Sequence, residues 1–183
     1  MKVEQIMSRP ALTCGVHDPA TRAVQLMWDA DIGCVIVVDA EEHLAGVITD
    51  RDVCMAAFLR GVPLGELTVG EVMTRSVATV RPDDRLGLAE ALMRSKRVRR
   101  LPVVDGKGRV AGLLSLNDLA RVAQLQRGRR VPEVAGDEVI ATLGAICEPR
   151  SAAEVVSTGT VERNLALTPT LSQSAQRERE VSR

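Results

Sequence analysis

The sequence predicts a mixed α/β (α+β-like) fold made of two β-α-β-β-α repeats packed with pseudo-two-fold symmetry, followed by a short C-terminal helix and a disordered tail. Three observations lead to this prediction: an internal duplication, a pattern of helix and strand periodicity inside each copy, and a change of composition after Gln126. The 183 residues suffice for one domain or two small ones with a sizeable core.

The duplication is visible without gaps. Residues 3–57 align with residues 69–123 at a constant offset of 66, so that Met7 falls on Met73 and Asp52 on Asp118. A single unit of about 55 residues buries too little surface to be stable alone. We therefore expect the two copies to share a core and to form equivalent clefts where they meet.

The first half of each unit is an extended piece and a helix. The extended pieces are expected at residues 11–14 and 77–80, and the helices at residues 19–31 and 85–97. In the first helix the apolar residues recur at the i, i+3, i+4, i+7 spacing of one buried face: Ala20, Ala23, Val24 and Met27.

The second half of each unit is two strands and a helix. The compact β-branched runs "CVIVVD" (34–39) and "LPVVD" (101–105) favour buried strands. A polar turn leads to a second strand, "LAGVI" or "VAGLL", and the last helices are expected at about residues 50–59 and 116–125.

The composition after Gln126 sets the remaining boundaries. "DEVIATLGAIC" (137–147) starts with two acids and carries an apolar stripe, which is typical of a short docking helix. Polar and small residues dominate beyond Pro149, which predicts disorder. The predicted parts are a first repeat (1–66), a second repeat (67–126), a linker with a short helix (127–150) and a disordered tail (151–183).

Composition and charge narrow the function classes. Trp28 and Phe58 are the only aromatic residues, so the core must be aliphatic. The formal net charge is zero, which gives no argument for a nucleic acid or an anionic membrane as partner. The N-terminus has no apolar run of signal-peptide length, and no stretch approaches the roughly 18 apolar residues of a membrane span. These features predict a soluble cytoplasmic protein.

The cysteines allow two interpretations. Cys14, Cys34, Cys54 and Cys147 form no C-x-x-C pair, and the two histidines, His17 and His43, are far apart in sequence, so we expect no metal site. Small buried thiols in a reducing compartment explain them. Because Cys14 and Cys34 both fall in predicted strands, a redox pair and hence a thiol-based stress sensor is the alternative.

The two unit endings, "GVITDRD" (46–52) and "GLLSLND" (112–118), have the spacing of a capping box with Asp in place of Glu. The hydroxyl of Thr49 or Ser115 would cap the backbone N–H three residues later, and Asp52 or Asp118 would lie in the first helical turn, where the helix dipole favours negative charge. This interpretation needs no ligand.

The duplicated unit, its "VVD" strand and its G-h-h-[ST]-x-x-[DN] ending together resemble a tandem pair of CBS domains, the regulatory modules named after cystathionine β-synthase. The resemblance covers residues 1–125, and "AICEPRSA" (145–152) is similar to the extension of stand-alone bacterial CBS-pair proteins of the hypoxic response type. It implies that AMP, ADP or ATP binds in the clefts between the repeats, with Mg²⁺ present only as the companion of ATP. It also implies a homodimer, often a flat disc, that regulates an unidentified partner protein.

The resemblance also implies roles for individual residues. The hydroxyls of Thr49 and Ser115 would contact phosphate, and the carboxylates of Asp52 and Asp118 the ribose. A helix N-terminus offers free N–H groups to phosphate, and a carboxylate suits two adjacent hydroxyl donors. The first adenine would lie near Ile32, Gly33 and Cys34 with Thr13, and the second near Val98, Arg99 and Arg100 with Thr79. Pro102, which matches the family pattern, would be a further nucleotide contact, whereas Ile36 stands where the first proline would be.

Two further stretches have alternative interpretations. The basic run "RSKRVRR" (94–100) is either a solvated helix end or places Arg99 or Arg100 against a phosphate. No basic face with interleaved aromatics supports nucleic-acid binding. The helical stretch 85–93 is apolar on two faces, one formed by Leu86, Ala89 and Met93 and the other by Leu88, Ala91 and Leu92. The second face would meet either a second chain or another part of the same chain.

The expected function is a non-enzymatic adenine-nucleotide sensor without a prosthetic group. No histidine sits in a plausible catalytic triad, and the candidate nucleophiles lack an evident base. The rival interpretation is a structural or oligomerisation module whose clefts stay unused and whose Thr-Asp and Ser-Asp pairs act purely as caps. Nucleotide should raise the melting temperature of a nucleotide sensor but not that of a structural module.

Overall fold

The computed structural model describes residues 1–149. The predicted disordered tail (151–183) and the end of "AICEPRSA" therefore lie outside the described residues. The described core is aliphatic, as predicted, since Trp28 is 83% exposed and Phe58 79% exposed. Within residues 1–149, no helix is both long and apolar enough to cross a bilayer.

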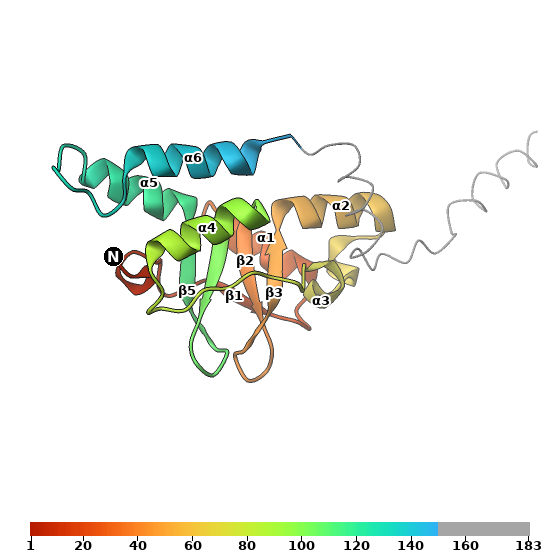
Figure 1. Cartoon of the computed structure of the whole chain (residues 1–183). Helices are drawn as coiled ribbons and strands as arrows, with labels where there is room; N and C mark the ends of the chain where they lie inside the picture. Colours follow the sequence, from red (N-terminus) through yellow and green to blue (C-terminus); the bar gives the residue numbers. More distant parts are fainter. Residues whose placement is uncertain (150–183) are drawn as a thin grey trace, which may run out of the picture. The chain divides into compact units, whose positions relative to one another are not determined.

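The first repeat contains a three-stranded sheet and two helices (Figure 1). β2 lies between β1, to which it is parallel, and β3, to which it is antiparallel. α1 begins after Pro19, and α2 ends at Gly61, whose φ of 62° is the left-handed C-terminal conformation that favours glycine. The elements are β1 (Thr13–Gly15), α1 (Ala20–Asp29), β2 (Cys34–Val38), β3 (Leu44–Thr49) and α2 (Asp50–Arg60).

The second repeat has the same order but one strand fewer. A short connector with the 3-10 turn η2 (Leu64–Glu66) leads into α3 (Val69–Val72), and the repeat continues with a helix, an antiparallel strand pair and a helix. Its elements are α4 (Leu86–Lys96), β4 (Arg100–Val104), β5 (Val110–Ser115) and α5 (Leu116–Leu125).

The predicted extended piece at residues 77–80 is reduced to one bridge, between Val80 and Val103. In the first repeat, the N–H of Ile36 donates to the Leu12 carbonyl at 3.2 Å and helps to hold β1 against β2. Pro102 occupies the equivalent position of the second repeat, and proline has no N–H to donate. The missing donor explains why this edge strand is shorter than the sequence predicts.

The two repeats exchange their leading segments. Val3 and Met7, which precede the first repeat's sheet, are buried in the core of the second repeat, whereas Val69 and Met73 are buried in the core of the first. Ser8 pairs with Leu113 across the repeats, and Val47 pairs with Thr74 in the same way. These two bridges are related by the offset of 66, so the predicted pseudo-two-fold symmetry is present in the backbone.

The β2–β3 and β4–β5 turns meet at the pseudo-two-fold axis. His43 bridges Arg109, and these two residues are themselves 66 positions apart. The Leu44 N–H donates to the Gly108 carbonyl at 3.1 Å, and the Val110 N–H donates to the Glu42 carbonyl at 3.4 Å. Figure 1 shows the two hairpin tips next to each other.

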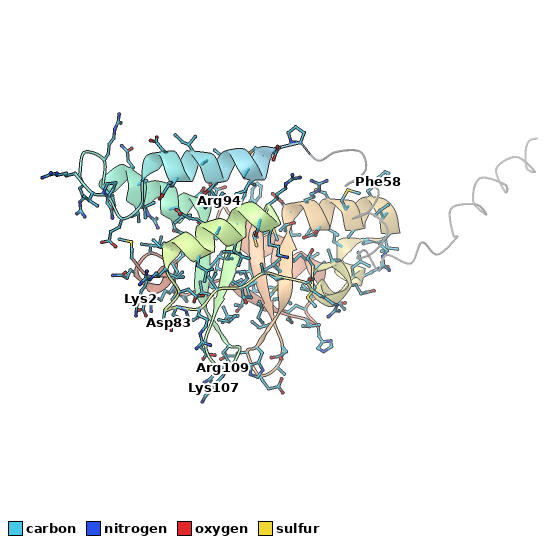
Figure 2. The ribbon with its side chains drawn as sticks, viewed as in Figure 1. Lys2, Phe58, Asp83, Arg94, Lys107 and Arg109 are labelled. Atoms are coloured by element: carbon cyan, nitrogen blue, oxygen red, sulfur yellow. The ribbon has the colours of Figure 1, made fainter. Side chains whose placement is uncertain are left out.

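α6 (Gly136–Cys147) packs on α4 and α5 of the second repeat (Figure 1). Arg94 of α4, labelled in Figure 2, donates from Nη1 to Thr142 Oγ1 of α6 at 3.1 Å, and Val139 is buried in the second core. The docking helix predicted at 137–147 is thus present. Of the two alternatives for the second apolar face of α4, contact within the same chain is met in part, because α6 covers part of this helix. Leu88, however, is 56% exposed.

Candidate functional site

The candidate site lies where the two sheets end and the helices α2 and α5 begin. Successive residues of a strand face opposite sides of a sheet. Val35 and Val37 face the first core, so Cys34, its cross-strand partner Thr49, and Thr13, the partner of Ile36, share the opposite face. This face is the one expected to form the first cleft.

The second sheet repeats this arrangement. Leu101 and Leu114 face the second core, and the pairs on the opposite face are Arg100 with Ser115 and Pro102 with Leu113. Val98 packs against the second core and is half-buried. Thr79 is also half-buried and precedes Val80, whose bridge to Val103 brings it alongside β4.

Both capping boxes are formed. In the first, the Asp52 N–H donates to Thr49 Oγ1 at 3.2 Å, and Asp52 Oδ2 accepts from the Thr49 N–H at 3.0 Å. In the second, the Asp118 N–H donates to Ser115 Oγ at 3.3 Å, and Asp118 Oδ2 accepts from the Ser115 N–H at 2.9 Å. The hydroxyl of Thr49 donates to Oδ2 of Asp52 and that of Ser115 to Oδ2 of Asp118, at 2.7 and 2.6 Å.

The two carboxylates differ in their second oxygen. Asp118 is 4% exposed, and its Oδ1 accepts from Arg121 at 2.6 Å and from the Ser8 hydroxyl at 3.3 Å. Asp52 is half-buried, and its bonds within residues 1–149 are those to Thr49 through Oδ2. A diol donor can therefore reach Asp52 directly, whereas at Asp118 it competes with the Arg121 guanidinium.

A hollow of about 310 Å³ opens at the second site. Predicted contacts Arg99, Arg100 and Ser115 line it, together with Leu116 and Asn117 of α5 and Leu143 of α6. Arg99 is exposed, and its Nη2 lies 4.0 Å from the Cys147 sulfur. The basic run thus brings two guanidinium groups beside the Ser115 cap, a geometry suited to an anionic ligand.

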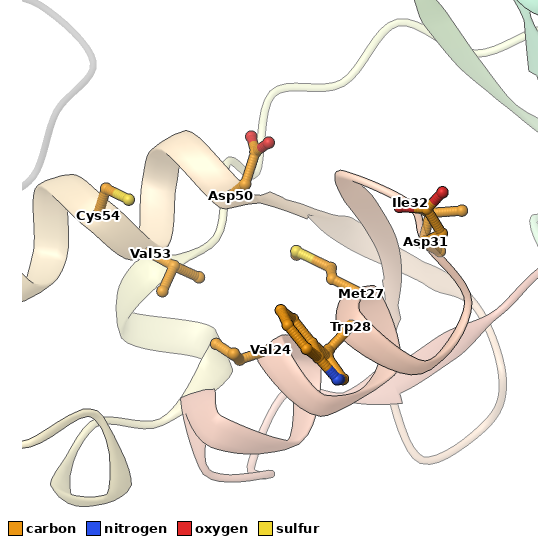
Figure 3. Close-up of a pocket in the computed structure, with 8 residues that line it drawn as sticks. All are labelled: Val24, Met27, Trp28, Asp31, Ile32, Asp50, Val53 and Cys54. Carbon is orange, nitrogen blue, oxygen red and sulfur yellow. The ribbon is translucent and has the colours of Figure 1, made fainter.

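The first repeat carries a different hollow, of about 350 Å³, between α1 and α2 (Figure 3). Val24, Met27 and Trp28 line it from α1, and Val53 and Cys54 line it from α2. Asp31 and Asp50 lie at its rim, and Ile32 is the one predicted adenine contact that this hollow includes. The carboxylate of Asp50 also lies over Gly33, where an added Cβ would stand 2.8 Å from Asp50 Oδ2.

The redox pair of Cys14 and Cys34, the alternative interpretation of these thiols, is not formed. Cys14 is in register with Val37, three residues beyond Cys34 on the neighbouring strand, and the two cysteines face opposite sides of the sheet. A disulfide cannot span such a separation without backbone movement. Burial raises the pKa of each thiol to about 11, so a smaller fraction is present as the reactive thiolate at neutral pH. This geometry contradicts the thiol-sensor alternative.

One cluster of possible metal ligands was missed by sequence reasoning. Asp39, Glu41 and His43 bring their ligand atoms within 4.8 Å of one another in the β2–β3 turn. Asp39 Oδ1 already accepts from the backbone N–H groups of Glu41 and His43, and these bonds hold its pKa below the usual range. The turn geometry alone accounts for the cluster.

Sequence reasoning also missed Asp50, Arg121 and Leu143. Asp50 directly follows the cap residue Thr49, and Arg121 stands three residues after Asp118 on the same helix, so their spacing could have indicated both. Leu143 could not be found in this way, because it comes from α6, which is separated from the second repeat by the linker.

Known protein families match the duplicated part of the chain. A family model described as "CBS domain" matches residues 3–58 and 69–124. The chain is 28% identical over 148 residues to hypoxic response protein 1 of Mycobacterium tuberculosis, covering 81% of this chain and 95% of that protein. It is 29% identical over 122 residues to an uncharacterised Methanopyrus kandleri protein, covering 67% of this chain and 62%, less than two thirds, of that relative.

Solved structures share the fold. The crystal structure of CBSX2 in complex with AMP is 28% identical, with a TM-score of 0.61 over 69% of this chain and 98% of that one. The CBS domain pair of protein MJ0100, in complex with 5′-methylthioadenosine and S-adenosyl-L-methionine, is 26% identical, with a TM-score of 0.62. That match covers 69% of this chain and 98% of the other.

Proposed function

The chain belongs to the CBS domain family, and from this premise we propose that it is a regulatory module that binds adenine nucleotides in the two clefts between its repeats. The observation that carries the proposal is the duplicated pair of hydroxyl and carboxylate at the N-termini of α2 and α5. Thr49 with Asp52 and Ser115 with Asp118 lie beside the sheet faces turned away from the cores. The AMP complex of CBSX2 supports the ligand class.

The capping boxes and the ligand contacts are compatible. Each carboxylate uses Oδ2 for the cap and can offer Oδ1 to a ribose hydroxyl. The hydroxyls of Thr49 and Ser115 can turn from the carboxylate toward a phosphate oxygen while the helix N–H groups add positive potential. In the second cleft, Arg121 would leave Asp118 and become available to the phosphate.

The module would act without catalysis or a prosthetic group. Nucleotide binding between the repeats would change how their exchanged leading segments pack, and a partner protein would respond to that change. We place the protein in the cytoplasm, where adenine nucleotides occur and where its free cysteines stay reduced.

We also propose a homodimer. The α1–α2 side of the first repeat exposes Trp28 and Phe58, whereas the equivalent side of the second repeat is covered by α6. Large exposed side chains at a hollow favour an interface. Light scattering should give twice the mass of the chain, and a mass equal to one chain would contradict this part of the proposal.

Calorimetric titration of AMP, ADP and ATP into the wild type, Asp52→Ala and Asp118→Ala tests nucleotide binding. A hydrogen bond to a charged group contributes about 1.5–3 kcal/mol, so losing it should weaken a site roughly ten- to hundredfold. Circular dichroism melting of each variant controls for the lost cap, which should cost about 1 kcal/mol. No binding to the wild type would favour the rival interpretation, a structural module whose Thr-Asp and Ser-Asp pairs act only as caps.

A further inference from the structure

The two clefts carry opposite charge at equivalent positions. At four positions the second repeat has an arginine where the first has an acidic or uncharged residue, each pair being related by the offset of 66. These pairs are Asp31 and Arg97, Gly33 and Arg99, Cys34 and Arg100, and Met55 and Arg121. The acid that follows the cap, Asp50, corresponds to the apolar Leu116, and only Arg51, opposite Asn117, runs against this trend. Arg97 is ion-paired with Glu148 at 3.6 Å, so it and Asp31 are left out of the charge count. With the shared Asp52 and Asp118 included, the formal charge of the remaining positions is −1 in the first repeat and +2 in the second.

Asp50 lies at the end of the first cleft where α2 begins. Asp50 is the first residue of α2, directly after Thr49, and it is exposed. Its carboxylate covers Gly33 so closely that an added Cβ would stand 2.8 Å from Oδ2. A phosphate that reached the Thr49 hydroxyl would therefore meet Asp50 as its neighbour.

The basic groups of the second repeat lie at the matching place. Arg99 and Arg100 line the hollow beside Ser115, and the neutral Asn117 lines it where the first repeat has Arg51. Arg121 adds a third guanidinium on α5, 2.6 Å from Asp118 Oδ1. Planar guanidinium groups grip phosphate oxygens in pairs, so this end is suited to a dianion.

Arg100 also acts on the first cleft. Burial is the main cause of the raised pKa of the Cys34 thiol. The Arg100 guanidinium lowers this pKa, and the carboxylates of Asp52 and Asp50 raise it.

We propose that, within the nucleotide-binding function proposed above, the two clefts divide their ligands by charge. The second cleft binds an adenine nucleotide through its phosphate. The first cleft binds an adenine nucleoside whose 5′ group is uncharged or cationic, because Asp50 and Asp52 outweigh Arg51 there and the guanidinium groups of Arg99 and Arg100 have no counterpart. One chain would thus compare a phosphorylated ligand with an unphosphorylated one.

Single-cleft variants allow each site to be measured alone. Asp52→Ala weakens the first cleft and Asp118→Ala weakens the second, each by roughly the ten- to hundredfold given above, and both variants are titrated with adenosine, 5′-amino-5′-deoxyadenosine and AMP. The second cleft should bind AMP about tenfold more tightly than adenosine, and the first should bind adenosine about tenfold more tightly than AMP. The free energy of this factor lies between the interaction energies of two unit charges in water and near a protein surface. The 5′-amine should bind the first cleft at least as well as adenosine.

An isosteric exchange tests the charges themselves. Asp50→Asn in the Asp118→Ala background should raise AMP affinity about tenfold, with a smaller change for adenosine. Asn117→Asp in the Asp52→Ala background should lower AMP affinity by a similar factor, and both positions are exposed, so the fold should tolerate these changes. Equal AMP affinities in the two single-cleft variants, or no response to Asp50→Asn, would overturn the division while leaving the proposed function intact. If none of the three ligands binds the wild type, the proposed function itself fails.

Discussion

The buried thiols show how one residue's surroundings decide its chemistry. Cys14 and Cys34 are each 5% exposed, and burial raises their pKa to about 11. Cys54 and Cys147 are exposed on α2 and α6. Because the thiolate is the nucleophile, the two pairs should differ strongly in reactivity.

Alkylation tests this difference. Iodoacetamide at pH 8 should add two groups to the native protein, at Cys54 and Cys147, and four to the unfolded chain. Mass spectrometry of peptides from the two samples identifies the sites. Labelling of Cys34 in the native protein at the rate of Cys54 would contradict the described burial.

Glu90 is a buried acid beneath α6. It is 5% exposed, and within the described chain its Oε1 has no hydrogen-bond partner. Burial and then the nearby Glu138 carboxylate raise its pKa, against a lowering by Arg94. The folded protein therefore binds this proton more tightly than the unfolded chain, and its stabilising contribution is lost as pH rises through the raised pKa.

Glu90→Gln should remove this pH dependence. At pH 7 the variant should be more stable than the wild type, because the neutral amide does not have to lose a proton there, and the gain should shrink at pH 5. Urea unfolding at both pH values measures it, with Glu66→Gln, an exposed acid in η2 that does not act on Glu90, as control. An unchanged difference between pH 5 and pH 7 in Glu90→Gln would exclude Glu90 as its source.

At the scale of elements, the leading segments hold the repeats together through close backbone contacts. A Cβ at Gly112 would lie 2.8 Å from the Ser8 carbonyl oxygen, and one at Gly46 would lie 2.5 Å from the Thr74 carbonyl oxygen. Both glycines thus permit the segment from the other repeat to approach.

Gly112→Ala should therefore destabilise the protein by about 1–3 kcal/mol, the usual cost of overpacking. Gly87→Ala, at the second residue of α4, is the matched control, because nothing lies within 4 Å of an added Cβ there. Denaturant unfolding compares the two variants. A Gly112→Ala protein as stable as Gly87→Ala would show that the segments do not pack so closely.

At the scale of the whole molecule, local sequence patterns predict more than long-range packing. The helix at 116–125 has the predicted bounds, and both capping boxes are formed as their spacing indicates. Periodicity carries no information on which sheet a segment covers, so the exchange of Val3 and Met7 into the second core could not be predicted. For the same reason the contact between α4 and α6 could not be predicted. The strand expected at 77–80 is lost because Pro102 has no N–H to donate, and the sequence pattern indicated Pro102 only as a ligand contact.

The measurement that tests the central claim most directly is thermal melting with and without AMP. A ligand that binds only the folded state at a hundred times its Kd stabilises it by about 2.7 kcal/mol, which should raise Tm by several degrees. The account predicts this shift in the wild type and a clearly smaller one in the Asp52→Ala/Asp118→Ala double variant. No shift in the wild type, or an equal shift in the double variant, would contradict binding of nucleotide in these clefts.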